Sequence, residues 1–143
     1  MNAQDVIRFT VPLPPAKIRS NTRTHWGNRV RVKQEYSLRV HAHYLWFRER
    51  DGVDATPWEA AQVTFTWRAC HLPDQANVLG NCKALLDILC MAPKSTQPNN
   101  TTYLGIIEDD KGVEAVGRVE KVAHRHEECV VVEITRWYTQ ECP

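Results

Sequence analysis

The alternation of hydrophobic and polar residues along the chain predicts four β-strands. The predicted strands span Val6 to Val11, Gln62 to Arg68, about Ala115 to Ala123, and Cys129 to Trp137. In the second strand, hydrophobic residues at 63, 65 and 67 alternate with polar ones, as in a strand with one buried face. The fourth is rich in β-branched residues, which favour the extended conformation. The first strand ends at Pro12, because proline lacks the N–H group that would continue a ladder.

Hydrophobic residues at helical spacing predict two helices. The first runs from about Val32 to Arg50, and its hydrophobic positions are Tyr36, Val40, Tyr44 and Phe47. The second runs from about Asn77 to Cys90, with a stripe formed by Val78, Cys82, Leu85, Leu86 and Leu89. We therefore expect an α+β (mixed α/β) fold with the order β-α-β-α-β-β. A chain of 143 residues suits a single domain, residues 1–143, in which two main helices pack on a mixed β-sheet.

Composition sets limits on compartment and cofactor. The chain has no hydrophobic run long enough to cross a membrane and no signal pattern at its start, so we expect a cytoplasmic protein without membrane contacts. Its odd number of irregularly spaced cysteines disfavours a disulfide framework. Gly105 and Gly112 are interpreted as turn residues rather than parts of a phosphate-binding loop, so no nucleotide cofactor is expected.

Positive charge is concentrated between Lys17 and Arg39, although the formal net charge is only +1. Within that segment Glu35 is the only acidic residue. Such a segment is a candidate for contacts with DNA phosphates. The candidate DNA-binding residues are Lys17, Arg19, Asn21, Arg23, Arg29, Arg31 and Lys33. Taken alone, a run of charge is more often a solvated surface.

Acidic residues and one lysine recur between Asp74 and Asp110. Asp74 precedes Asn77, Lys83 and Asp87 lie four residues apart on the second predicted helix, and the acids at 108–110 follow. Carboxylate oxygens are hard ligands that suit Mg²⁺, and a lysine can neutralise a phosphate. This combination is typical of a metal-dependent phosphodiesterase. The alternative for Lys83 and Asp87 is an ordinary ion pair on a helix surface.

These motifs, in this order, resemble the RusA family of Holliday junction resolvases, especially its phage and prophage branch. The matching runs are Asp74-Gln-Ala-Asn77, Lys83-Ala-Leu-Leu-Asp87 and Leu104-Gly-Ile-Ile-Glu-Asp-Asp110. The opening Val11-Pro-Leu-Pro-Pro15 is also similar to the start of that family. The resemblance implies a homodimeric, Mg²⁺-dependent endodeoxyribonuclease that cuts four-way DNA junctions by paired nicks. It also implies a bacterial host and a phage or prophage origin.

Carried over from that family, five residues are candidate catalytic residues. Asp74 matches the first essential aspartate, Lys83 the family lysine, Asp87 a recurrent acid, and Asp109 with Asp110 the later essential acid. We expect Asp74, Asp87 and Asp110 to hold Mg²⁺, for which Mn²⁺ can substitute, with Asp109 as an alternative ligand. Lys83 is expected to contact the scissile phosphate.

The chain departs from the family pattern at Ala76, where the best-known members have a second aspartate. Two additional residues also separate Asn77 from Lys83, and Asp87 or Asn77 is expected to supply the missing oxygen. Two other functions stay open. One is a non-catalytic protein that binds branched DNA and has lost a metal ligand at Ala76. The other is a small metal-binding domain without DNA, which the basic segment argues against.

Two further interpretations concern aromatic residues and histidines. Tyr44, Trp46 and Phe47 on the first helix either contribute to a subunit interface or pack on the sheet. The histidines at 41, 43, 71, 124 and 126 fit no standard zinc spacing, even with the neighbouring cysteines. We interpret them as surface histidines and the cysteines as mostly buried thiols.

Overall fold

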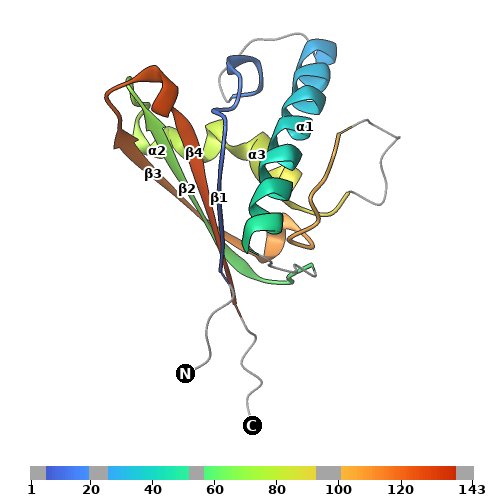
Figure 1. Cartoon of the computed structure of the whole chain (residues 1–143). Helices are drawn as coiled ribbons and strands as arrows, with labels where there is room; N and C mark the ends of the chain where they lie inside the picture. The colour runs from blue at the N-terminus through green and yellow to red at the C-terminus, as the bar shows by residue number, and fades with distance from the viewer. Residues whose placement is uncertain (1–5, 20–25, 52–56, 93–100, 138–143) are drawn as a thin grey trace, which may run out of the picture.

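Four strands form one mixed sheet, and all the α-helices pack against a single face of it (Figure 1). The computed structural model describes residues 6–19, 26–51, 57–92 and 101–137. The strands are β1 (Val6–Val11), β2 (Ala61–Ala69), β3 (Val113–Lys121) and β4 (Cys129–Arg136). The helices are α1 (Trp26–Asp51), α2 (Gln75–Asn81) and α3 (Lys83–Leu89), with short 3₁₀ turns η1 (Ala16–Ile18), η2 (Asp110–Gly112) and η3 (Arg125–Glu127).

The strand order is β1-β4-β2-β3. β4 lies antiparallel between β1 and β2, whereas β2 and β3 are parallel. Parallel neighbours need a crossover, and the chain makes it through α2, α3 and the segment that follows them. Ala61 therefore pairs with Val113 at one end of the sheet and Ala69 with Lys121 at the other. The crossover returns the chain to the end of the sheet where β2 began.

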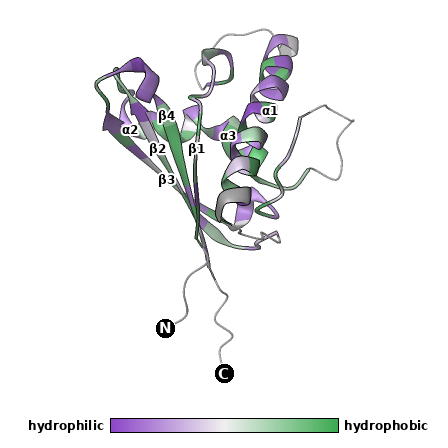
Figure 2. Cartoon of the chain, in the orientation of Figure 1, coloured by the Kyte–Doolittle hydropathy of each residue, from purple (hydrophilic) through white to green (hydrophobic). Residues whose placement is uncertain are grey.

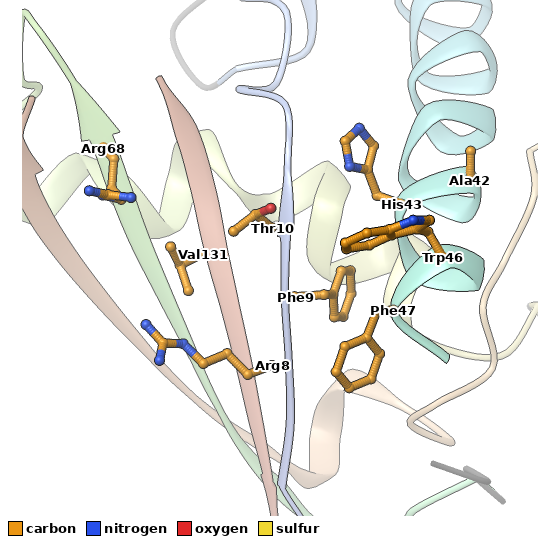
Figure 3. A pocket seen from close by; sticks show the side chains of 9 residues that line it. All are labelled: Arg8, Phe9, Thr10, Ala42, His43, Trp46, Phe47, Arg68 and Val131. Atoms are coloured by element: carbon orange, nitrogen blue, oxygen red, sulfur yellow. The ribbon is translucent and has the colours of Figure 1, made fainter. Parts of the chain in front are cut away.

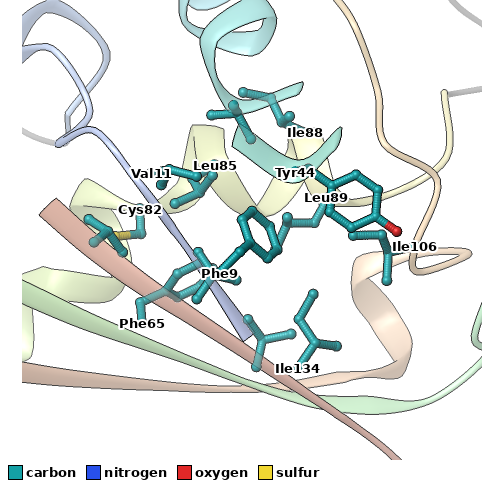
Figure 4. Close-up of a cluster of buried hydrophobic side chains, with 14 of the residues drawn as sticks. Phe9, Val11, Tyr44, Phe65, Cys82, Leu85, Ile88, Leu89, Ile106 and Ile134 are labelled. Carbon is teal, nitrogen blue, oxygen red and sulfur yellow. The ribbon is translucent and has the colours of Figure 1, made fainter. Parts of the chain in front are cut away.

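The core lies between the sheet and the helices, as the pattern of hydrophobic positions predicted. Figure 4 shows Phe9 and Phe65 from the sheet among Leu85, Ile88 and Leu89 of α3. Phe9 also lies 5.3 Å from the ring of Tyr44 and 6.0 Å from that of Phe47, measured between centroids. Burial of each such side chain contributes about 1.5–3 kcal/mol. These contacts fix α1 against β1, and Figure 2 shows both hydrophobic and hydrophilic residues along that helix.

The α+β fold expected from the sequence is confirmed, and the first strand spans the predicted residues. α1 begins at Trp26 rather than Val32, so it also carries Arg29 and Arg31. The second predicted helix is wrong as a single element. It is divided at Cys82 into α2 and α3, and Cys82 has φ −100° and ψ 8°. The preceding Gly80-Asn81 pair has low helix propensity, which accounts for a break there.

Among the described residues, no helix is both long enough and apolar enough to span a membrane.

Candidate functional site

An extended segment places the acids at 108–110 beside α3. The amide of Leu104 donates to the carbonyl oxygen of Ile88 at 2.8 Å, and the amide of Ile106 donates to that of Leu89 at 3.0 Å. On its other side, the amide of Glu108 donates to the carbonyl oxygen of Trp58 at 3.0 Å. The segment is therefore held between α3 and the chain that leads into β2.

Two glycines allow this path. Gly105 has φ +68°, the left-handed region that favours glycine, and its amide donates to the carbonyl oxygen of Cys90. A Cβ atom on Gly112 would collide with the carbonyl oxygen of Glu59. The turn that carries Asp109 and Asp110 is thus pressed onto the backbone before β2. Gly112 belongs to the η2 turn, as predicted, whereas Gly105 lies within the extended segment.

The result is an acidic pocket of about 840 Å³. It is lined by Lys33, Asp87, Cys90, Met91, Ala92, Tyr103, Glu108, Asp109 and Asp110. Asp87 comes from α3, the other three acids come from the start of the η2 turn, and Lys33 comes from α1. Sequence reasoning did not place Lys33 in this pocket, because only tertiary packing brings it there.

Asp109 and Asp110 act on each other's ionisation. Their side chains share a hydrogen bond, which lowers the pKa of Asp109 and raises the pKa of Asp110. Burial and the charges of Asp109 and Asp87 raise the pKa of Asp110 further. Asp109 also accepts a hydrogen bond from the amide of Lys111 at 3.1 Å, which favours its charged form. Negative charge is therefore favoured on Asp109 and disfavoured on Asp110.

Cys90 lies against the same acids but is not suited to bind a metal. Burial raises the pKa of its thiol to about 12, and the charges of Asp110, Asp87 and Asp109 act in the same direction. The Sγ atom also donates to the carbonyl oxygen of Leu86 at 3.3 Å. A protonated thiol is a poor ligand, so the oxygen atoms provide the pocket's binding chemistry.

A basic groove of about 440 Å³ adjoins the acidic pocket. It is lined by Ile18, Arg29, Val30, Lys33, Gly80, Lys83, Ala84 and Asp87. Lys33 and Asp87 line both cavities, and the Nζ atom of Lys33 lies 3.3 Å from Oδ2 of Asp87. This ion pair forms the wall that the acidic pocket and the basic groove share. Lys83 and Asp87 both face the groove, in agreement with their predicted common face.

Asp74 lies apart from the acidic pocket. It precedes the first residue of α2, is exposed, and follows the end of β2, whereas Asp109 and Asp110 precede the start of β3. Because β2 and β3 are parallel, these two points belong to opposite ends of the sheet, which are about 26 Å apart for a nine-residue strand. Ala76 is exposed on α2 beside Asp74.

The predicted DNA-binding residues occupy different surroundings. Lys17 is exposed on η1, and Arg31 is exposed on α1 with Nη2 3.4 Å from Oδ1 of Asn28. Asn21 and Arg23 lie outside the described residues. Of the described candidates, Arg29 and Lys33 line the basic groove.

Arg19 is held by internal contacts. Its Nε atom donates to the carbonyl oxygen of Pro14 at 2.7 Å, and its guanidinium carbon lies 4.8 Å from the centroid of the Trp67 ring. Partial burial lowers the pKa of Arg19, although Cys82 and Tyr36 oppose that effect. The side chain of Arg19 therefore links the segment that follows β1 to strand β2.

The aromatic residues of α1 divide between core and surface. Tyr44 and Phe47 pack on the sheet, whereas Trp46 is 63% exposed. Leu38 and Leu45 are also exposed, at 59% and 40%, on the same side of the helix as Ala42. Together, Leu38, Ala42, Leu45 and Trp46 form an outer stripe on α1.

A further pocket, of about 730 Å³, lies at β1, on the edge of the sheet. Figure 3 shows Arg8 and Arg68 on one side of β1, with Trp46 and Phe47 on the other. These arginines lie near glutamates, with Arg8 4.0 Å from Glu133 and Arg68 3.3 Å from Glu120. None of the predicted catalytic acids lines this pocket, so we place the candidate site at the acidic pocket.

The donor atoms of the acidic pocket suit Mg²⁺. Magnesium prefers oxygen ligands and is usually held by one or two carboxylates together with water. Asp87 and Asp110, with Asp109 adjacent, provide such oxygens. Over the part of the chain that the structure describes, no group of three or more His, Cys, Asp or Glu side chains is placed to hold a metal ion together. Asp87 and Asp110 can therefore offer at most one or two carboxylates to an ion that keeps most of its water.

His43 and His71 are exposed, as interpreted from the sequence, whereas His41 is half-buried, and only two of the four described cysteines are buried. His124 and His126 are exposed, and their rings stack with centroids 5.3 Å apart. Cys70, Cys82, Cys90 and Cys129 are free thiols, and Cys82 and Cys90 are buried.

Comparison with known proteins gives no assignment for this site. No protein-family model matches the chain, and no curated protein matches it either.

Proposed function

We propose that this chain is a Mg²⁺-dependent, RusA-type endodeoxyribonuclease that resolves four-way DNA junctions. The observation that carries the proposal is the acidic pocket lying against a basic groove, with Lys33 and Asp87 in their shared wall. A phosphodiesterase needs carboxylates for a cation and positive groups for the DNA backbone within reach of one phosphate. The order of motifs from Asp74 to Asp110 supports the same function.

In this proposal the basic groove binds DNA and the acidic pocket holds the metal ion. Arg29 and Lys83 bind the phosphate backbone in the groove and orient the scissile phosphate toward Asp87. Asp87 and Asp110, with Asp109, would hold Mg²⁺, and a bound Mg²⁺ would supply an activated water and neutralise charge on the phosphoryl group. Asp110 has to be deprotonated to act as a ligand, and the raised pKa makes this harder at low pH.

The position of Asp74 gives the proposed homodimer a chemical role. Since Asp74 and Asp110 belong to opposite ends of the sheet, a two-fold partner is the route by which Asp74 reaches an acidic pocket. A junction has near two-fold symmetry, so a dimer also supplies one site for each of the paired nicks. The outer stripe on α1 is an apolar surface that can support such a contact.

The experiment is cleavage of one synthetic four-way junction in Mg²⁺, with binding measured separately in Ca²⁺. Wild type is expected to release paired nicked products, and Asp110→Asn to bind the junction but cut it at least about 100-fold more slowly. Linear duplex of the same sequence is the substrate control. Cleavage by Asp110→Asn at the wild-type rate would remove the acidic pocket from the chemistry.

The alternative is a non-catalytic protein that binds branched DNA. Ala76 stands where the family has an acid, and among the described residues no three His, Cys, Asp or Glu side chains are placed to hold a metal ion together; both observations favour this alternative. It predicts binding to the junction in Ca²⁺ with no nicked product in either Mg²⁺ or Mn²⁺. The same assay therefore separates the two functions.

A further inference from the structure

Lys33 forms an ion pair with an acid of the acidic pocket. Its Nζ atom lies 3.3 Å from Oδ2 of Asp87, although the residues are 54 positions apart in the sequence. Their side chains are 27% and 38% exposed, so the pair is partly shielded from water. Lys83, the lysine that sequence reasoning selected, is exposed and lines the groove but not the acidic pocket.

The position of Lys33 is fixed by the packing of α1. One turn earlier on the same side of the helix, Arg29 lines the basic groove. One turn later, the hydroxyl of Ser37 accepts a hydrogen bond from the amide of Thr102 at 2.9 Å. That bond joins α1 to the segment that leads to the acids. α1 thus carries Lys33 to the boundary between the two cavities.

We propose that Lys33 is a positioning residue that exchanges partners. In the metal-free protein its ammonium group neutralises Asp87 and keeps that carboxylate at the shared wall. A divalent cation competes with Lys33 for Asp87, and the released ammonium group then contacts phosphate in the basic groove. The phosphate contact rests on the proposed nuclease function, whereas the competition for Asp87 does not.

Metal titration without DNA tests the competition directly. Mn²⁺ binding is measured by calorimetry for wild type, Lys33→Met and Lys33→Arg. Removal of a partly exposed ion partner is expected to tighten Mn²⁺ binding about two- to fivefold, because the cation no longer displaces an ammonium group. Lys33→Arg keeps a charge near Asp87 and is expected to stay near wild type. Unchanged or weaker Mn²⁺ binding by Lys33→Met would overturn the proposal.

A double-mutant cycle identifies Asp87 as the group through which Lys33 acts. In an Asp87→Asn background, Lys33→Met is expected to change Mn²⁺ affinity by less than about 1.5-fold. The matched control is Lys121→Met, which removes an exposed lysine outside both cavities and is expected to leave Mn²⁺ affinity unchanged. A full Lys33 effect in the Asp87→Asn background would contradict the exchange. Circular dichroism melting of each variant identifies any loss of folding.

Junction assays connect the exchange to DNA. At saturating Mg²⁺, Lys33→Met is expected to lower the cleavage rate about tenfold or more despite its tighter metal binding, and Lys33→Arg to recover most of that rate. If wild type cuts while Lys33→Met binds Mn²⁺ like wild type, the exchange fails and the nuclease stands. If wild type cuts no junction, the proposed function fails, and the Mn²⁺ titration still decides whether Lys33 competes for Asp87.

Discussion

The backbone of Gly112 lies directly against the carbonyl oxygen of Glu59, with no room for a Cβ atom between them. This contact seats the turn that carries Asp109 and Asp110 on the chain entering β2. Gly112→Ala is therefore expected to lower the free energy of unfolding by about 1–3 kcal/mol, because backbone has to move to relieve the collision. Urea denaturation at constant temperature measures the effect.

The control for that variant is Glu114→Ala, an exposed position two residues further along the chain. It is expected to change the free energy of unfolding by no more than about 0.5 kcal/mol. Because the contact between Gly112 and Glu59 positions Asp109 and Asp110, Gly112→Ala is also expected to bind Mn²⁺ more weakly at a temperature where the variant is fully folded. Equal stability of Gly112→Ala and wild type would mean that this contact does not position the acids.

Cys82 predicts a loss of stability at high pH. Burial raises the pKa of its thiol from 9.0 to about 12 in the folded chain, although Arg19 opposes the shift. Between these values the unfolded chain releases a proton that the folded chain retains. The free energy of unfolding therefore falls as pH rises from about 9 toward 12, and this thiol contributes up to about 1.4 kcal/mol per pH unit.

Comparison of wild type with Cys82→Ala isolates that contribution. The variant has a smaller core side chain and is expected to be less stable throughout, so the slopes with pH are compared rather than the values. Thermal melts from pH 8 to pH 11 are expected to give a shallower decline for Cys82→Ala. Parallel declines would show that Cys82 does not retain its proton in the folded chain.

The basic groove predicts a particular salt dependence of junction binding. If Arg29 and Lys83 each contact one phosphate, then Arg29→Gln or Lys83→Gln removes about one counterion released on binding. The slope of log affinity against log salt concentration is expected to become shallower by about 0.9 for either variant, measured in Ca²⁺ by fluorescence anisotropy. Lys121→Gln serves as the control outside the groove. An unchanged slope for Arg29→Gln would exclude the groove from the contact surface.

The separation of Asp74 from Asp110 predicts complementation between two inactive variants. If each site combines Asp74 of one subunit with Asp110 of the other, a heterodimer of Asp74→Asn and Asp110→Asn contains one intact site and one doubly altered site. Mixed variants are then expected to nick one strand of a junction, whereas each variant alone does not cut. If both residues serve the site within their own subunit, the mixture stays inactive. Gel analysis of singly nicked product distinguishes these outcomes.

Sequence reasoning recovers the strands and the long helix because their signals are local. Phe65 and its alternating neighbours mark β2, and the stripe from Tyr36 to Phe47 marks the buried side of α1. The break at Cys82 escapes such reasoning because the hydrophobic stripe continues through it. Local propensity at Gly80 and Asn81 was the available signal.

The candidate site is less predictable, because its geometry comes from topology and packing. The order of the elements along the chain does not predict that β2 and β3 pair in parallel. This parallel pairing separates Asp74 from Asp110. The sequence groups Lys33 with a basic run, whereas the packing of α1 near α3 brings it to Asp87. No spacing rule connects residues 54 positions apart, so the sequence indicated the acids but not the lysine that pairs with Asp87.

Arg19 and Lys17 provide a matched test of whether the basic segment serves the fold or DNA. Arg19 donates to the carbonyl oxygen of Pro14 and lies over the ring of Trp67, whereas Lys17 is exposed two residues earlier. Arg19→Gln is expected to lower the free energy of unfolding by about 1–3 kcal/mol, since it removes a charged hydrogen bond and a cation–π contact. Lys17→Gln is expected to change it by less than about 0.5 kcal/mol. Urea denaturation of both variants decides, and equal stabilities would return Arg19 to the set of candidate DNA contacts.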